Sequence, residues 1–108
     1  MQVRLSIKSL NEGVRRSRTY YNDTDELVES HFYNILGRHS AGLLDSKSRI
    51  ELDFQPGKVV LRPRFIPSVE VDGTSILPDE PIVIHPKQDY ILNLAGDEFL
   101  VTAHEYEQ

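Results

Sequence analysis

Between residues 58 and 103 one pattern recurs: two apolar residues stand two positions apart, which is the period of a half-buried strand. The pairs are Val59 and Leu61, Val69 and Val71, Ile82 and Ile84, Leu92 and Leu94, and Phe99 and Val101. Turn-forming residues separate them, namely Pro63, Pro67, Asp72-Gly73, Pro78, Pro81, Pro86 and Gly96-Asp97. The stretch therefore predicts a mainly β domain, a sandwich of short antiparallel strands.

Two hairpins are expected within this pattern. Ile50, Leu52 and Phe54 alternate with polar residues, and the Gln55-Pro56-Gly57 segment follows with proline and glycine in the order of a type II turn. We therefore pair 49–54 with 58–62. The Ala95-Gly96-Asp97 segment predicts a second turn, between 90–94 and 98–103.

The N-terminal segment predicts another hairpin. Val3, Leu5 and Ile7 alternate with polar residues, as in a strand with one wet face. The turn residues 11–13 follow, and 14–21 can return as the partner strand. Because this returning strand is polar and rich in arginine, we expect it at a sheet edge, where arginines discourage unwanted pairing.

The period changes after Asp23. Apolar residues then recur at the spacing of one helix face, at Leu27, Val28, His31, Phe32, Ile35 and Leu36. Asp23 with Glu26 resembles a capping box, and Gly37 suits a C-terminal stop. The pattern predicts one amphipathic helix at about 24–36.

The length of 108 residues favours a single domain. We divide it into an N-terminal hairpin and helix at 1–36, a β-rich part at 37–103 and a frayed tail at 104–108. Within the loop 37–48 we expect Leu43 and Leu44 to pack inward.

Composition and charge exclude several classes of protein. There is no cysteine, hence no disulfide and no thiolate metal site, which fits a cytoplasmic location. The N-terminus has no signal-peptide pattern, and no window has the roughly 18 apolar residues that a membrane span needs. The net charge of −5 argues against nucleic acid as a partner.

No catalytic or metal-binding motif is present. His31, His39, His85 and His104 do not form a helical pair at metal-ligand spacing, so neither a metal nor a cofactor is predicted. The serines lack the Gly-x-Ser-x-Gly elbow of hydrolases. We therefore expect a protein that is not an enzyme.

Three arginines and two tyrosines gather in the returning strand. Arg15, Arg16 and Arg18 stand next to Tyr20 and Tyr21, and arginine forks suit carboxylates or phosphates. Two interpretations are open. The cluster is either a solvated edge strand or a partner-binding surface formed by Arg15, Arg16, Arg18 and Tyr20 that fits an acidic groove of another protein.

From Gly37 onward the order of residues resembles forkhead-associated (FHA) domains. The elements that carry the resemblance are Gly37-Arg38, Ser48-Arg49, the hairpin at 50–63, the Val71-Asp72-Gly73 turn and the two closing strands around Leu94-Ala95-Gly96-Asp97. The resemblance covers about the last two thirds of the chain. It implies a β-sandwich that binds phosphothreonine peptides, with Arg38, Ser48 and Arg49 as ligand-binding residues.

The chain departs from the family pattern at three places. Glu51 stands where the family has histidine, Asp72 stands where it has asparagine, and its Asn-Gly-Thr segment has no counterpart at 64–68. Carboxylates beside a phosphate site oppose binding by like-charge repulsion. We therefore expect a degenerate FHA-like domain, acting in protein–protein interaction or assembly. A phosphopeptide-binding domain, a structural subunit of a phage particle or secretion machine, and a β-grasp arrangement are the alternatives.

Charge is unevenly distributed along the chain. Residues 1–64 hold 11 of the 12 basic residues and 8 of the 17 acidic ones, whereas 65–108 hold 1 and 9. Opposed patches orient association between proteins. We therefore expect protein partners at an arginine-bearing edge and at an acidic face, with self-association as one possible outcome.

Overall fold

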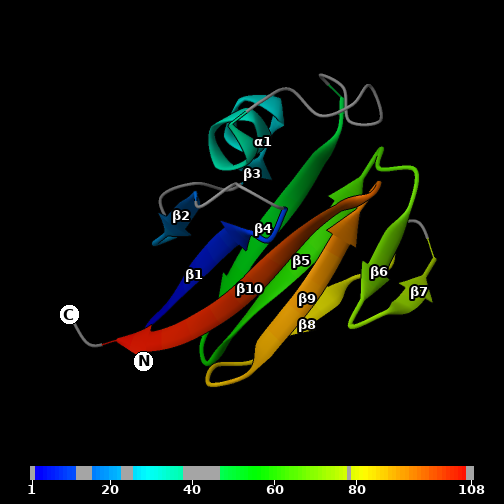
Figure 1. The fold of residues 1–108 in the computed structure, drawn as a ribbon. Coiled ribbons are helices and arrows are strands. Elements are labelled where there is room, and N and C mark those ends of the chain that lie inside the picture. The colour runs from blue at the N-terminus through cyan, green and yellow to red at the C-terminus, as the bar shows by residue number, and fades with distance from the viewer. Residues whose placement is uncertain (1, 12–15, 23–25, 38–46, 78, 107–108) are drawn as a thin grey trace.

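Two antiparallel sheets and one short helix make up the chain in a computed structural model that describes residues 2–11, 16–22, 26–37, 47–77 and 79–106 (Figure 1). The larger sheet has the order β2-β1-β10-β9-β6-β7, and the smaller one the order β3-β4-β5-β8. The strands of the larger sheet are β1 (Gln2–Ser9), β2 (Ser17–Tyr20), β6 (Val69–Val71), β7 (Thr74–Ile76), β9 (Asp89–Leu94) and β10 (Asp97–Tyr106). The smaller sheet consists of β3 (Glu26–Leu27), β4 (Arg49–Gln55), β5 (Lys58–Arg64) and β8 (Ile82–Ile84), and the helix is α1 (Glu29–Leu36). The mainly β prediction is confirmed.

The core lies between the two sheets, because alternate residues of each central strand point inward. In β1 the buried positions are Val3, Leu5, Ile7 and Ser9, and in β10 they run from Asp97 through Phe99 and Val101 to Ala103. Helix α1 adds Phe32, whose ring centroid lies 6.3 Å from that of Phe99. The helix is therefore attached to the strand at the centre of the larger sheet.

The C-terminal strand is longer than the sequence indicated, and the expected fraying at 104–108 is wrong for residues 104–106. β10 continues to Tyr106, and its residues Phe99–Tyr106 pair with the whole of β1, from Ser9↔Phe99 to Gln2↔Tyr106. The Oη of Tyr106 also lies 3.2 Å from the Oε1 of Gln2. The polar tail remains in the strand because β1 offers it a hydrogen-bonding partner that the local sequence does not reveal.

The helix begins later than predicted. Glu26 and Leu27 form β3, paired with Glu51 and Ile50 of β4, and α1 starts at Glu29. Val28 occupies the N-cap without a side-chain hydrogen bond, so Glu26 forms no capping box; Asp23 lies outside the described residues. Leu27 is buried in β3, where strand pairing with β4 prevails over the helical period. The predicted stop is confirmed, because Gly37 is left-handed (φ 72°) and its N–H donates to the Tyr33 carbonyl at 2.7 Å.

The predicted hairpins form. β4 and β5 pair from Arg49↔Arg64 to Gln55↔Lys58, with Gly57 at φ 79° as a type II turn requires. β9 and β10 join through Ala95 and Gly96, both at positive φ. Leu43 and Leu44 lie outside the described residues.

One strand and one proline differ from the prediction. The Asp72-Gly73 turn leads into β7, which the sequence pattern did not identify. Pro63 lies inside β5, opposite Ile50, instead of between strands. It is tolerated there because β8 pairs with β5 only at 59–61, so no other strand of the described residues pairs with this end of β5 on that side.

Candidate interaction surfaces

Ser48 and Arg49, the residues that the FHA resemblance implied for phosphate, both contact Phe65. Ser48 is buried, and its Oγ donates a 2.7 Å hydrogen bond to the Phe65 carbonyl. The Arg49 guanidinium lies 5.7 Å from the centroid of the Phe65 ring, and its Nε lies 3.5 Å from Glu26 Oε1. Arg38 lies outside the described residues. Ser48 and Arg49 thus already have intramolecular partners, and the described residues do not bring all three predicted ligands together.

Phe65 itself has an unusual conformation. Its φ of 56° is rare for a bulky side chain, and 63% of its surface is exposed. The contacts from Ser48 and Arg49 hold the residue in place. No sequence pattern indicated this exposed aromatic, because a positive φ was not expected at a phenylalanine.

The edge strand β2 forms what we call the arginine edge, defined by Arg16 and Arg18. Its position at the edge of the larger sheet is confirmed. The Arg18 guanidinium lies 5.5 Å from the centroid of the Tyr20 ring. Arg16 packs against Gly37 at the C-terminus of α1, where a Cβ added to the glycine would lie 3.0 Å from Arg16 Nε. A cation at this position is favourable because the last helical carbonyls carry negative partial charge. Arg15 lies outside the described residues.

Tyr20, which was predicted as part of the partner-binding surface, lies in the core. Only 1% of it is exposed, because β2 turns this side chain into the core, where its ring lies 5.8 Å from that of His31. The Tyr20 hydroxyl has no hydrogen-bond partner among the described residues, and burial raises its pKa well above the usual value. Burial, with a smaller contribution from Arg18, lowers the pKa of His31, while a hydrogen bond with the backbone of Glu26 acts in the opposite direction.

The opposite end of the larger sheet carries what we call the acidic edge: Glu70 of β6, Asp72 of the β6–β7 turn, and Asp79 and Glu80 after β7. Asp72 Oδ1 accepts a 2.8 Å hydrogen bond from the Ile91 amide, and Glu80 Oε2 accepts one of 3.0 Å from the Leu77 amide. None of the four forms an ion pair within the described part of the chain. The sequence from 65 to 86 contains no lysine or arginine, so the negative charge is not neutralised locally.

Strand order places these two surfaces far apart. β2 and β7 are the first and last strands of the six-stranded sheet, and Figure 1 shows them on opposite sides of the molecule. The expectation of two separated charged surfaces therefore agrees with the placement of Arg16, Arg18 and the four carboxylates. Sequence reasoning located the charges, but strand order was needed to place them at the two ends of one sheet.

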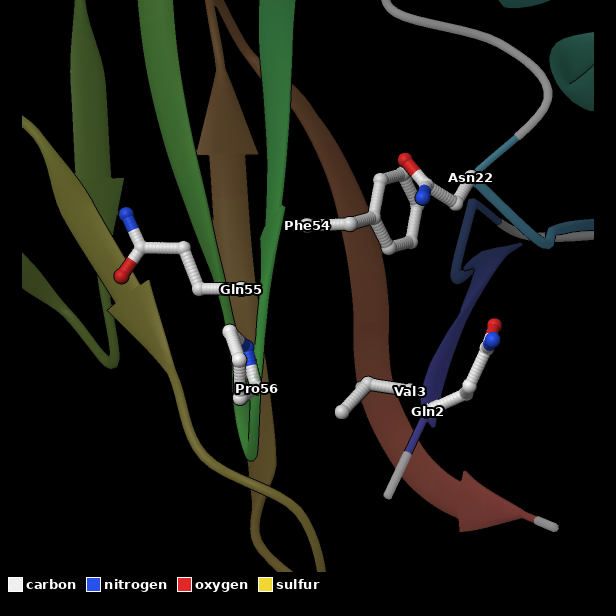
Figure 2. Close-up of a pocket in the computed structure, with 6 residues that line it drawn as sticks. All are labelled: Gln2, Val3, Asn22, Phe54, Gln55 and Pro56. Atoms are coloured by element: carbon white, nitrogen blue, oxygen red, sulfur yellow. The ribbon is translucent and has the colours of Figure 1, made fainter.

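A pocket of about 310 Å³ lies between the start of β1 and the β4–β5 turn (Figure 2). Its lining consists of Gln2, Val3, Asn22, Phe54, Gln55 and Pro56. The Phe54 ring faces the Asn22 amide, whereas the Gln55 side chain points away toward β8. None of the six side chains ionises, so the lining supplies no general base or nucleophile.

Two further features are absent from the described residues. They contain no group of three or more His, Cys, Asp or Glu side chains that could hold a metal ion. No helix among them is long and apolar enough to cross a membrane.

Comparison with protein-family models, with curated proteins and with solved structures finds no match.

Proposed function

We propose that the chain is a non-enzymatic protein-interaction or assembly module that acts in the cytoplasm and resembles a degenerate FHA domain. The observation that carries the proposal is the presence of opposite charges at the two open edges of the larger sheet. Surfaces of this kind steer partners and set their orientation more than they add affinity.

This proposal takes only the β-sandwich fold from the FHA resemblance. It does not include phosphopeptide binding. Ser48 donates to a backbone carbonyl, and Arg49 lies beside both Glu26 and Phe65. A phosphate would have to compete with these contacts. Calorimetry with a library of phosphothreonine peptides should therefore show no preference over unphosphorylated peptides. A preference of about tenfold or more, lost in Arg38→Ala, would favour the phosphopeptide alternative.

A structural subunit of a phage particle or secretion machine is the second candidate. The observation that favours it is that the two charged edges lie at opposite ends of one sheet, so a single copy can contact two neighbours at once.

Affinity capture with the immobilised full chain tests the proposal. Partners should be recovered at low ionic strength and lost at about 0.5 M salt, where screening is strong. The reversal Arg16→Glu/Arg18→Glu should remove them. The control Lys58→Glu/Lys87→Glu changes net charge by the same amount away from both edges, and it should retain them. Capture that is insensitive to the arginine reversal and equally insensitive to salt would refute the proposal.

A further inference from the structure

We infer that the partner of each charged edge is a second copy of this chain: β2 of one copy pairs with β7 of the next, and the six-stranded sheets join head to tail. The inference rests on the proposed function and adds to it the identity of the partner and the geometry of the contact.

Both edges have unpaired backbone that can accept another strand. Among the described residues, β2 pairs only with β1 and β7 pairs only with β6. Ser17 and Thr19 of β2 are exposed, as are Thr74 and Ser75 of β7. Small hydroxyl side chains do not obstruct the approach of a second strand, and the free N–H and C=O groups of an edge form a template for pairing.

Charge favours one pairing of edges over the others. β2 beside β7 brings Arg16 and Arg18 toward the carboxylates of the acidic edge, whereas β2 beside β2 gathers arginines and β7 beside β7 gathers carboxylates. Like-charge juxtaposition costs free energy and excludes the symmetric arrangements. The favoured contact is therefore heterologous, and unless the rotation between copies closes a ring it continues as an open chain.

Each edge also presents one large apolar side chain directly after its strand. Tyr21 follows β2 and is 48% exposed, and Leu77 follows β7 and is 73% exposed. Burial of such side chains at a contact supplies the stabilisation that screened surface charges lack. Charge sets the orientation in this arrangement and, together with the apolar pair and the backbone hydrogen bonds, supplies the affinity.

A mixing experiment tests this geometry. The variant Arg16→Gln/Arg18→Gln keeps an intact acidic edge, and Glu70→Gln/Asp79→Asn keeps an intact arginine edge. Asparagine suits position 79 because it tolerates the positive φ of 66° found there. The mass of each full chain is measured by light scattering at low salt, with Lys58→Gln/Lys87→Gln as the control.

We expect the mass of the wild-type chain to rise with concentration beyond that of a dimer and to return to that of one chain at about 0.5 M salt. Each edge variant alone should remain a single chain at concentrations about tenfold above those at which the wild type associates. Their equimolar mixture should form a pair that stops at twice the chain mass, because each member has one working edge. The control should associate like the wild type.

Three results would overturn the inference: a wild-type mass that never rises, edge variants that each associate like the wild type, or a mixture that fails to pair. The variant Glu70→Gln/Asp79→Asn controls for misfolding, because its substitutions lie away from the buried Tyr20. If the wild type is monomeric and affinity capture still depends on Arg16 and Arg18, self-association fails and the proposed function stands. If capture is also insensitive to the arginines and to salt, both fail.

Discussion

The two edges of the larger sheet differ in how closely their charges are coupled to the core. At the arginine edge, Arg18 lies over the buried Tyr20 and Arg16 packs against the end of α1. At the acidic edge, Val69 is the only buried residue of the β6–β7 hairpin. The charges of the arginine edge therefore also contribute to the fold, whereas the acidic edge can change its charge with little effect on stability.

Truncation of an apolar side chain should give the largest difference in unfolding free energy between the two edges. Tyr20→Ala should lower the free energy of unfolding by about 3–5 kcal/mol, because a fully buried aromatic leaves a cavity. Leu77→Ala beside the acidic edge should cost less than about 0.5 kcal/mol, because the side chain is largely exposed. Denaturant unfolding of both variants measures the difference, and equal costs would abolish the contrast between the edges.

A matched pair of glycines sharpens the contrast. Gly37 and Gly73 both have positive φ, 72° and 82°, so alanine strains either position by about 1–2 kcal/mol. At Gly37 the new Cβ also meets Arg16 Nε at 3.0 Å, whereas at Gly73 nothing lies within 4 Å. Gly37→Ala should therefore be the more destabilising by several tenths of a kcal/mol to about 1 kcal/mol. A larger cost at Gly73, measured by thermal unfolding, would show that Arg16 does not hold the end of the helix.

Removal of the Tyr20 hydroxyl tests whether this buried group has a hydrogen-bond partner. Tyr20→Phe should leave stability unchanged or raise it by about 1 kcal/mol, because the Tyr20 hydroxyl is buried without a partner in the described residues. The ring beneath Arg18 is retained. A loss above about 1 kcal/mol would reveal a hydrogen bond to this hydroxyl.

The smallest effect is on pH dependence. Burial and Arg18 lower the pKa of His31 below its ordinary 6.5, so the unfolded chain takes up a proton first as the pH falls. The His31 contribution to stability is thus complete above about pH 6.5 and declines below it. Between pH 7.5 and 5.5 the wild type should lose more unfolding free energy than His31→Gln. Equal losses in the two chains would contradict this.

The strands were predictable because they depend on local alternation, and the turns because they depend on residues that accept positive φ. Gly37 ends helix α1, and Gly57 lies in the turn between β4 and β5, as the sequence indicated. The start of the helix was not predictable, since Leu27 fits the apolar face of either a helix or a strand. The extension of β10 to Tyr106 depends on β1, a partner about a hundred residues away.

The candidate site was less predictable than the fold. Short motifs identified Ser48 and Arg49 but could not show that both contact Phe65. Tyr20 was assigned to a partner surface because it stands next to the arginines in the sequence, which does not show that its side chain is buried. The opposition of the charged edges follows from strand order, which arises from non-local pairing and cannot be read from the period of any one segment.

The central claim is that opposite charges at the two edges bring chains together, and Ser75 offers its most direct test. This exposed residue of β7 lies opposite Glu70 and carries no charge, so one position can be given either sign. The association constant of the full chain at low salt is measured by sedimentation for Ser75→Lys and Ser75→Glu. We predict that lysine weakens association by about tenfold, that glutamate strengthens it, and that both changes vanish at about 0.5 M salt. Shifts of the same sign in both variants, or no shift in either, would contradict the account.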